Sequence, residues 1–430
     1  MNDLKERLQA QGVHTLLVQF TDVHGVAKGK YVPLAHLGDV LRTGAGFAGP
    51  SIWGTGLPRT GPRAEYYARG DAATVTALPW LPGVARIVGD GFVDGQPFDA
   101  CPRQVLRRAL ARLGQLGLSL KTGIEPEFFL LKNVGGQWLP ADDGDRLDKP
   151  SYDLKSLPRQ GDFLHALSGA LSAAGLDVLQ IDHEDAHGQY EVNFAFDDAL
   201  ASCDHLLLFK LAAHTLAEQR GLVFSMMPKP FANQPGSGLH FHASLWRGDT
   251  LADGVGRAFI AGVLKHAAAL CAIAAPTVNS YKRLSVGESL SGTTWAPAYV
   301  AHGPNNRTAL VRTLPGRFEW RVPDASANPY LATAALVAAG LDGIERNLDP
   351  GPATTDDLFQ LSLPQIRARG IPVLPQSLAE AADALEADEV VCAALGPTLT
   401  AEFLRLKRAE ALAYARHVSS WELDRYAAAF

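Results

Sequence analysis

Two glutamates stand two positions apart within an apolar stretch of the chain. Residues 123–131 read Gly-Ile-Glu-Pro-Glu-Phe-Phe-Leu-Leu, which places carboxylates at Glu125 and Glu127. On a β-strand both side chains would point to one face, because residues i and i+2 share a face. Neighbouring carboxylates repel each other unless a cation lies between them. A solvated pair on an edge strand is the alternative, and the apolar residues that follow disfavour it.

A second acidic segment contains a glycine that favours a turn. Glu184 and Glu191 lie on either side of Gly188, so a turn at the glycine would bring the two carboxylates to adjoining strands. Acidic turns are common, and this segment alone does not distinguish a ligand site from a solvated turn.

Histidines occupy alternate positions in a third segment. His240, His242 and Ser244 follow a Gly-rich bend at residues 235–238, and on a strand they would share one face. A His-x-His strand is typical of metal sites, although paired histidines also occur in cores and on surfaces.

Arginines are concentrated in later segments, again beside a carboxylate. Glu319 and Arg321 would share one face of an apolar strand. Guanidinium groups match carboxylates and phosphates, so several of them near a carboxylate cluster predict a site for an anionic substrate. Any one of them alone is better explained as a surface or structural residue. The set comprises Arg283, Arg307, Arg312, Arg317 and Arg321.

Together these segments predict a metal site that works on phosphates. The candidate ligands are five glutamates and one histidine, and hard oxygen donors with a single imidazole suit Mg²⁺ or Mn²⁺ rather than Zn²⁺. Metal ions and arginines without a nucleophilic serine or cysteine indicate phosphoryl transfer, in which positioning and charge neutralisation do most of the catalysis. The chain has no Walker A, G-x-G-x-x-G or G-x-S-x-G motif, so ATP phosphates would be held by other means.

The elements that must position these residues divide the chain at residues 97–104. Residues 1–98 predict short strands and turns, and a helical pattern begins after Pro102. Beyond it, strands and helices alternate irregularly, which favours an α+β fold. The remaining predictions are a long helix from Asn328-Pro329, a surface loop over 348–377 and helices over 378–430.

Composition excludes several classes of protein. The chain of 430 residues has a formal net charge of −6, which argues against nucleic acid or an anionic membrane as its main partner. Four widely separated cysteines make no disulfide framework and indicate a reducing cytoplasm. The N-terminus has no apolar signal region, and Lys265 and His266 interrupt the most apolar stretch, 258–276. We therefore expect a cytoplasmic protein.

In this order, the segments resemble the glutamine synthetase family. The similarity runs from Phe20-Thr-Asp-Val-His-Gly25 to Val418-Ser-Ser-Trp-Glu422. It implies a small N-terminal β-grasp domain over 1–98 and a catalytic domain over 99–430 with a partial β-barrel. It also implies a homo-oligomer, usually a dodecamer, with active sites between subunits. The implied reaction is ATP-dependent ligation of an amine to the γ-carboxylate of L-glutamate through γ-glutamyl phosphate, with two or more Mg²⁺ or Mn²⁺ ions per site.

The resemblance also implies a role for each matched residue. One metal ion would be held by Glu127, Glu184 and Glu191, and the other by Glu125, His240 and Glu319. The residues implied for glutamate are Gly236, Arg283 and Arg321, and those for ATP are Phe196, His242, Ser244, Arg307 and Arg312. Arg307 and Glu288 are implied as catalytic residues.

Three departures from the family pattern concern the substrates. An aspartate that binds and deprotonates ammonium in the family is replaced by Ala48. Glu288 stands one position away from the usual flap glutamate, and Pro235 replaces a usual asparagine. Ala48 and the run Ser-Gly-Thr-Thr-Trp-Ala-Pro at 291–297 are similar to the branch with type III glutamine synthetases and γ-glutamylmethylamide synthetases. We therefore expect methylamine or another small alkylamine to be preferred over ammonia, which stays the alternative.

Other functions remain open at this point. They are a glutamate–polyamine or glutamate–ethanolamine ligase of the same family, a phosphotransferase such as a guanidino kinase, and a catalytically silent relative. The intact set of metal ligands disfavours the silent relative. Control by tyrosine adenylylation is not expected, because Phe359 stands in the loop where regulated relatives carry the modified tyrosine.

Overall fold

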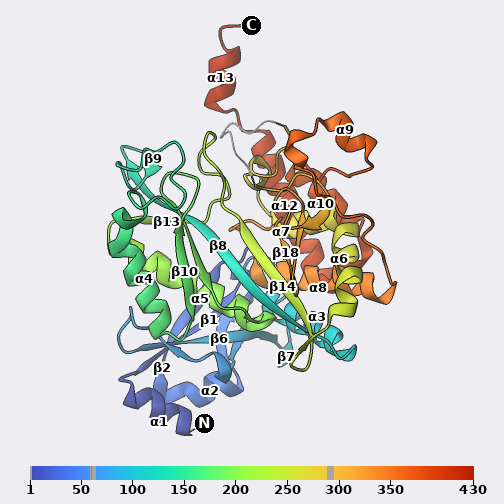
Figure 1. Ribbon diagram of the computed structural model, residues 1–430. Coiled ribbons are helices and arrows are strands. Elements are labelled where there is room, and N and C mark those ends of the chain that lie inside the picture. Colours follow the sequence, from blue (N-terminus) through green and yellow to red (C-terminus); the bar gives the residue numbers. More distant parts are fainter. Residues whose placement is uncertain (1, 59, 61–63, 288–294) are drawn as a thin grey trace.

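The computed structural model describes residues 2–58, 60, 64–287 and 295–430, and the strands of these residues form two sheets (Figure 1). The sheet nearer the N-terminus has the order β2-β1-β6-β4-β3, with β1 and β6 parallel and the other neighbours antiparallel. This is the β-grasp arrangement that the resemblance implied. Its strands are β1 (Thr15–Thr21), β2 (Ala27–Pro33), β3 (Ala45–Ala48), β4 (Glu65–Gly70), β5 (Thr76–Ala77), β6 (Val84–Val93) and β7 (Gln96–Pro97).

Two helices accompany this sheet, although the sequence predicted only strands and turns over residues 1–98. They are α1 (Asn2–Ala10) and α2 (Leu37–Arg42). Helix α1 is polar except for Leu4 and Leu8, which stand four positions apart and therefore share one face. Both pack against the hydrophobic core of the sheet, so a narrow apolar face is enough to hold this short helix.

The second sheet has eleven described strands, and β8 is its longest. The main order is β10-β11-β8-β14-β18-β17-β16, and the sheet bends into a partial barrel. Strands β8 and β14 run side by side through the middle of the molecule (Figure 1). The strands are β8 (Ser119–Val134), β9 (Gln137–Pro140), β10 (Val178–His183), β11 (Gln189–Phe194), β12 (Asp197–Asp198), β13 (Val223–Ser225), β14 (Leu239–Arg247), β15 (Thr250–Leu251), β16 (His302–Pro304), β17 (Val311–Leu314) and β18 (Arg317–Trp320).

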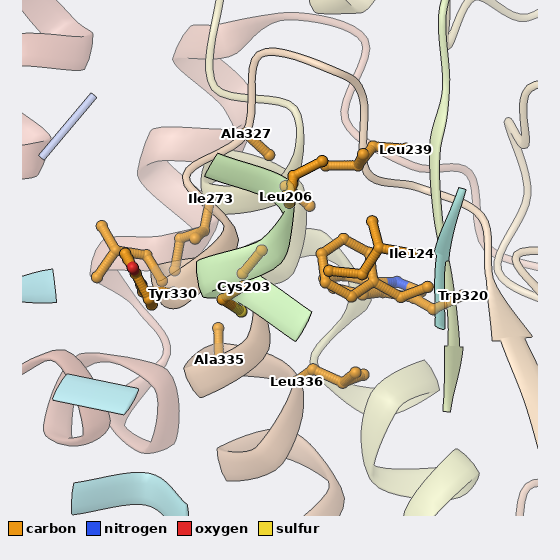
Figure 2. Packing of buried hydrophobic residues seen from close by; sticks show 14 of the residues in the cluster. Ile124, Cys203, Leu206, Leu239, Ile273, Trp320, Ala327, Tyr330, Ala335 and Leu336 are labelled. Atoms are coloured by element: carbon orange, nitrogen blue, oxygen red, sulfur yellow. The ribbon is translucent and has the colours of Figure 1, made fainter. Parts of the chain in front are cut away.

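Helices cover the second sheet and bury its apolar face. In the core, Trp320 and Ile124 from the sheet lie beside Leu336 of helix α8 (Figure 2). Each is at most 1% exposed, which is the burial expected of a close-packed interior. The helices are α3 (Pro102–Gln115), α4 (Gly161–Ala173), α5 (Ala199–Glu218), α6 (Gly256–Lys265), α7 (Ala267–Ala274), α8 (Pro329–Glu345), α9 (Leu363–Ala368), α10 (Leu378–Glu386), α11 (Glu389–Leu395), α12 (Pro397–Ala415) and α13 (Ser420–Tyr426).

Helix α8 begins where the sequence predicted a helix start. The side chain of Asn328 accepts the backbone N–H of Tyr330 and Leu331, with Pro329 at the first helical position. The expected surface loop over 348–377 is partly wrong, because α9 forms within it. A capping box of Ser362 and Gln365 marks its start, where the side-chain oxygen of Gln365 accepts the backbone N–H of Ser362 at 2.8 Å.

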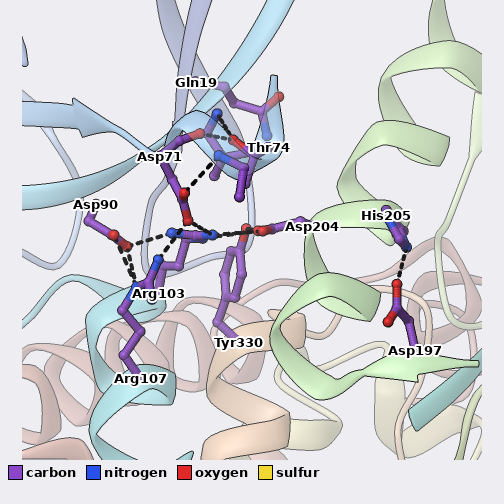
Figure 3. Close-up of polar contacts among 12 residues, drawn as sticks. Gln19, Asp71, Thr74, Asp90, Arg103, Arg107, Asp197, Asp204, His205 and Tyr330 are labelled. Carbon is purple, nitrogen blue, oxygen red and sulfur yellow. Dashed lines mark hydrogen bonds and ion pairs between the residues drawn. The ribbon is translucent and has the colours of Figure 1, made fainter. Parts of the chain in front are cut away.

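A buried ion network joins the N-terminal sheet to helices α3 and α5 (Figure 3). Arg103 on α3 donates to three carboxylates at 2.8–3.0 Å, those of Asp71, Asp90 and Asp204. Asp71 and Asp90 belong to the first hundred residues, whereas Asp204 lies on α5. The Arg103 side chain is 3% exposed, so this charge is compensated inside the protein rather than by water.

The α+β fold predicted from the sequence is confirmed. The helices predicted after Pro102 and over 378–430 are present as α3 and as α10 to α13. Within the described ranges no single helix is long and apolar enough to cross a bilayer, and only α6 and α7 together reach that length, with a bend of 78° between them.

Candidate active site

Side chains predicted from the sequence form a row across five neighbouring strands. The register pairs Glu191 with Glu127, Glu125 with His240, His242 with Glu319, and Glu319 with Arg312. These pairs lie on β11, β8, β14, β18 and β17 in that order. Residues directly opposite in adjacent strands have Cβ atoms about 5 Å apart, so charged groups from distant segments meet on one surface.

An open cavity of about 710 Å³, the acidic cavity, contains most of this row. Nine predicted residues line it: Glu125, Glu127, Glu184, Glu191, His240, Arg307, Arg312, Glu319 and Arg321. A cavity with carboxylates at its base and guanidinium groups at its wall can bind cations and anions side by side.

Three carboxylates form the first cluster of this cavity. Oxygens of Glu127, Glu184 and Glu191 lie within 4.8 Å of one another. Burial and the neighbouring carboxylates raise the pKa of Glu184 to about 8 and hold the pKa of Glu191 well above its usual value. In the described part of the chain, no lysine or arginine forms an ion pair with these three groups. The three groups can therefore all be ionised near neutral pH only with a counter-charge from outside the protein.

The second cluster combines carboxylates with both histidines of the His-x-His pair. Oε1 of Glu125 lies 3.0 Å from Nε2 of His242, and Oε2 lies 3.7 Å from Nδ1 of His240. Nδ1 of His240 is 3.6 Å from Oε1 of Glu319. Burial raises the pKa of Glu125, but the two histidines outweigh this and hold the pKa below its usual value. The prediction named only His240 as a ligand, whereas His242 lies closer to Glu125 than His240 does.

The two clusters fit hard divalent cations. Carboxylate oxygens dominate the donor set, the imidazoles are few, and the carboxylates lie too close together to be ionised without compensation. Neighbouring groups also orient the ligands. The backbone N–H of Gly238 donates to Glu127 at 2.8 Å, and the amide of Asn193 donates to Glu191 at 2.9 Å.

Two of the predicted arginines flank Glu319. Arg312 donates to its Oε2 at 2.9 Å, and Arg321 donates to its Oε1. Glu319 is 1% exposed, and its pKa is lowered because His240 and the two arginines outweigh the effect of burial. The two guanidinium groups are thus held at the cavity by their bonds to the Glu319 carboxylate.

Some predicted residues lie outside the wall of the acidic cavity. Arg283 is buried beneath the loop at Gly236 and donates to the backbone oxygens of Val322 and Arg321 at 3.0 and 3.2 Å. The others that do not line the cavity are Gly236, His242, Ser244 and Phe196. Glu288 lies outside the described residues.

An aromatic pair beside the row was only half predicted. The ring of Phe196 is stacked on that of Trp246, with centroids 6.5 Å apart and planes 19° apart. The indole N–H of Trp246 donates to the hydroxyl of Ser244 at 2.9 Å, and the ammonium of Lys121 lies 5.0 Å from its ring. Trp246 continues the alternation of His240, His242 and Ser244, so the sequence did carry a signal for this residue.

Other lining residues were not predicted. Tyr152, Lys149 and Trp295 contribute to the wall of the acidic cavity. Tyr152 adopts a positive φ of 60°, a backbone conformation that is rare for side chains other than Gly, Asn and Asp. The loop that carries it, with no regular element and no repeated pattern, gave no signal in the sequence.

Ala48 lies away from this cavity in its own chain. It ends strand β3, is exposed, and pairs only with Glu65 in the described register. Pro235 does line the cavity, so a proline where the family usually has asparagine changes the cavity wall directly.

Known proteins resemble this chain over nearly its whole length. Residues 99–426 match the family model described as glutamine synthetase, catalytic domain. The chain is 50% identical to a glutamate–methylamine ligase of Methyloversatilis universalis over 99% of this chain and 98% of that protein. It is 38% identical to a glutamine synthetase of Rhizobium leguminosarum bv. phaseoli, over 98% of each chain. A solved structure described as a GmaS/ADP complex superposes with a TM-score of 0.92 at 38% identity, covering 99% of both chains. The chain therefore belongs to the glutamine synthetase family.

Proposed function

We propose that the chain is an ATP-dependent ligase that joins methylamine to the γ-carboxylate of L-glutamate through γ-glutamyl phosphate. The observation that carries this proposal is the row across β11, β8, β14, β18 and β17, which gathers cation ligands and anion-binding groups in one cavity. Membership of the family implies the use of ATP and divalent metal ions. Its named members are ligases that form an amide.

Methylamine is proposed over ammonia on two grounds. The relative at 50% identity is named for methylamine, whereas those at 38% are named for glutamine. The second ground is Ala48, which has no charge to capture ammonium. An apolar residue at this place would favour a methyl group, whose burial contributes about 0.8 kcal/mol.

The metal ligands are proposed in two sets, as the resemblance implied. Glu127, Glu184 and Glu191 would hold one Mg²⁺ or Mn²⁺ ion, and Glu125, His240 and Glu319 the other. Bound cations would neutralise phosphate charge during transfer to the glutamate carboxylate. The protein's part is to fix the ligands, and the N–H of Gly238 does this for Glu127.

The arginines are proposed to receive the anionic substrates. Arg307 and Arg312 would contact the ATP phosphates, and Arg321 the carboxylate of glutamate. Arg312 and Arg321 both donate to Glu319, so a bound anion would compete with Glu319 for them. Release of Glu319 would free it to serve as a metal ligand, which couples substrate binding to the completion of the metal site.

The nucleotide is proposed to lie beside the aromatic pair. Phe196 is 58% exposed and presents a ring face for a base, while His242 and Ser244 lie on β14, the strand that carries the stacked Trp246. Gly236 and Arg283 would shape the glutamate pocket from below, since Arg283 packs directly under the loop. Glu288 is proposed to act on the amine.

We also propose a homo-oligomer, a dodecamer as in the family, with the two domains divided near residue 98. Helix α13 projects away from the body (Figure 1) and exposes large apolar side chains, with Trp421 60% exposed and Leu423 56% exposed. Apolar surface of this kind is typical of subunit contacts. Ala48 in turn can reach an active site only in a neighbouring subunit, because it is absent from the cavity of its own chain.

A screen of amines tests the function. The purified chain is supplied with ATP, glutamate and Mg²⁺ or Mn²⁺, together with ammonia, methylamine, ethylamine, ethanolamine or putrescine. Glutamate-dependent phosphate release and a γ-glutamyl amide identified by mass are expected, with the highest kcat/KM for methylamine. Phosphate transfer without an amide would indicate a phosphotransferase, and no release with any amine would indicate a silent relative. A preference for ethanolamine or putrescine would indicate the other ligases.

A further inference from the structure

A loop outside the row of site residues is attached to the turn that carries Glu184. The loop spans residues 141–156 and follows β9, and the turn spans residues 184–188, between β10 and β11. Strand β11 continues from this turn and carries Glu191. The shape of the turn therefore sets the separation of two of the three carboxylates in the first cluster.

The centre of the attachment is a pair of side chains with no exposure, those of His183 and Asp145. Nε2 of His183 lies 2.9 Å from Oδ2 of Asp145, and its Nδ1 lies 2.8 Å from the backbone oxygen of Glu184. The same Oδ2 of Asp145 accepts the backbone N–H of Gly188 at 2.7 Å. His183 precedes the turn and Gly188 closes it, so one carboxylate holds both ends.

Further contacts join the same loop to the same turn. The Leu147 backbone oxygen lies 2.8 Å from Nε2 of His187, and the N–H of Tyr152 donates to the backbone oxygen of His183 at 3.1 Å. The hydroxyl of Ser156 donates to the second oxygen of Asp145 at 3.1 Å. The Asp145 carboxylate is thus engaged on both oxygens and has little freedom to move.

We propose that His183 and Asp145 are positioning residues for the metal site. They hold the turn in the conformation in which Glu184 and Glu191 converge with Glu127. This inference rests on the proposed function, because it assigns a task to carboxylates that are proposed to bind a metal ion. Groups that orient metal ligands typically change metal affinity 10–100-fold when they are removed.

A purely structural role would predict something else. In that case the pair would stabilise the fold without changing the affinity for metal. The chain offers a matched control, because His266 is also buried and has both ring nitrogens near carboxylates, Asp388 at 2.6 Å and Asp342 at 3.0 Å. None of these three residues lines the acidic cavity.

The test is Mn²⁺ binding to the full chain by calorimetry, with thermal unfolding recorded for every variant. The dissociation constant for Mn²⁺ is expected to rise 10–100-fold in Asp145→Ala and in His183→Gln. A smaller rise is expected in Asp145→Asn, which keeps one acceptor oxygen. His266→Gln is expected to unfold at a lower temperature while its Mn²⁺ affinity stays that of the wild type.

Each outcome bears on the proposal. Unchanged Mn²⁺ affinity in folded His183→Gln and Asp145→Asn would overturn it, as would an equal loss in His266→Gln. If Asp145→Ala does not fold, the two milder variants decide. A wild type that binds no Mn²⁺ would overturn the proposed function and this inference together. A wild type that binds Mn²⁺ but forms no γ-glutamyl amide would overturn only the proposed function.

Discussion

At the scale of single residues, Glu184 and Glu191 combine burial with like-charge neighbours. In an unfolded chain both would ionise near the ordinary glutamate value of 4.5, whereas burial and repulsion raise the folded pKa of Glu184 to about 8. A raised carboxyl pKa means that the folded state binds more protons. The stability linked to these protons is complete below pH 4.5 and is lost as pH rises through about 8.

The metal-free protein is therefore expected to unfold at a lower temperature at pH 8.5 than at pH 6. Added Mg²⁺ should raise the unfolding temperature more at pH 8.5, because it compensates the ionised carboxylates. Thermal unfolding in EDTA and in Mg²⁺ at both pH values measures this. Glu184→Gln is the control, since it removes one charge and should weaken both effects. Equal stabilisation by Mg²⁺ at the two pH values would contradict the assignment.

Part of the site could be predicted from the sequence, and the rest depends on tertiary structure. Alternation placed Glu125 with Glu127 and His240 with His242, because a strand period needs no tertiary information. It could not show that His242 faces Glu319, since this depends on the register of β14 and β18, more than seventy residues apart. Nor could it show that Arg283 lies beneath the loop at Gly236, because burial depends on how distant segments pack.

At the scale of elements, His266 stands at the bend between α6 and α7, and its ring binds Asp342 of α8 and Asp388 at the N-cap of α11. Burial lowers the pKa of His266, but its hydrogen bonds with Asp388 and Asp342 outweigh burial and raise the pKa above its usual 6.5. The stability from this raised pKa is complete below pH 6.5 and is lost as pH rises through the folded value.

Substituting His266→Gln is expected to lower the free energy of unfolding by about 1.5–3 kcal/mol at pH 6, the range for hydrogen bonds to charged groups. The loss should be smaller at pH 9, because deprotonation of the wild-type ring at high pH removes this contribution. Urea unfolding at the two pH values measures it. His36→Gln serves as control, because the His36–Asp39 pair is more than half exposed and should contribute little at either pH. A loss of unfolding free energy that is the same at both pH values would contradict the role assigned to the charged imidazole.

Short elements were the ones that the sequence did not predict. Helix α9 has only six residues, so its apolar pattern is too short to separate from a loop. Its capping box of Ser362 and Gln365 with an intervening proline was nevertheless a readable signal. Helix α8 was predictable because its cap and its length both appear in the sequence.

At the scale of the whole molecule, Arg103 on α3 joins the N-terminal sheet to helix α5 through Asp71, Asp90 and Asp204 (Figure 3). Arg103→Met would leave these carboxylates without their buried cation and should cost about 3–5 kcal/mol of unfolding free energy. Arg107→Met is the matched control. Arg107 pairs with Asp71 and Asp90 too, but it is 37% exposed and should contribute less than about 1 kcal/mol. Equilibrium unfolding compares the two variants. Equal losses of unfolding free energy would show that the buried arginine stabilises the protein no more than the exposed one.

The placement of Ala48 leads to a prediction about assembled subunits. Ala48→Asp should shift the ratio of kcat/KM for methylamine over ammonia toward ammonia by about fourfold or more, the equivalent of one buried methyl group. If the site is shared, the shift should also appear when Ala48→Asp is carried on a chain inactivated by Glu127→Ala and mixed with wild type. Ala48→Ser is the uncharged control. An unchanged ratio in the mixed assembly would place the amine site within one subunit.

Strand β8 binds partners that are far apart in the chain, and this has a consequence for synthesis. Its Phe128 and Phe129 are fully buried in the finished protein, yet β14 leaves the ribosome only after residue 239 and β18 only after residue 317. Until then a long apolar strand has an open edge, which is a template for aggregation. The N-terminal sheet can form early, since its strands end at residue 97. The nascent chain is therefore most exposed to aggregation in the interval between the synthesis of β8 and that of β14 and β18.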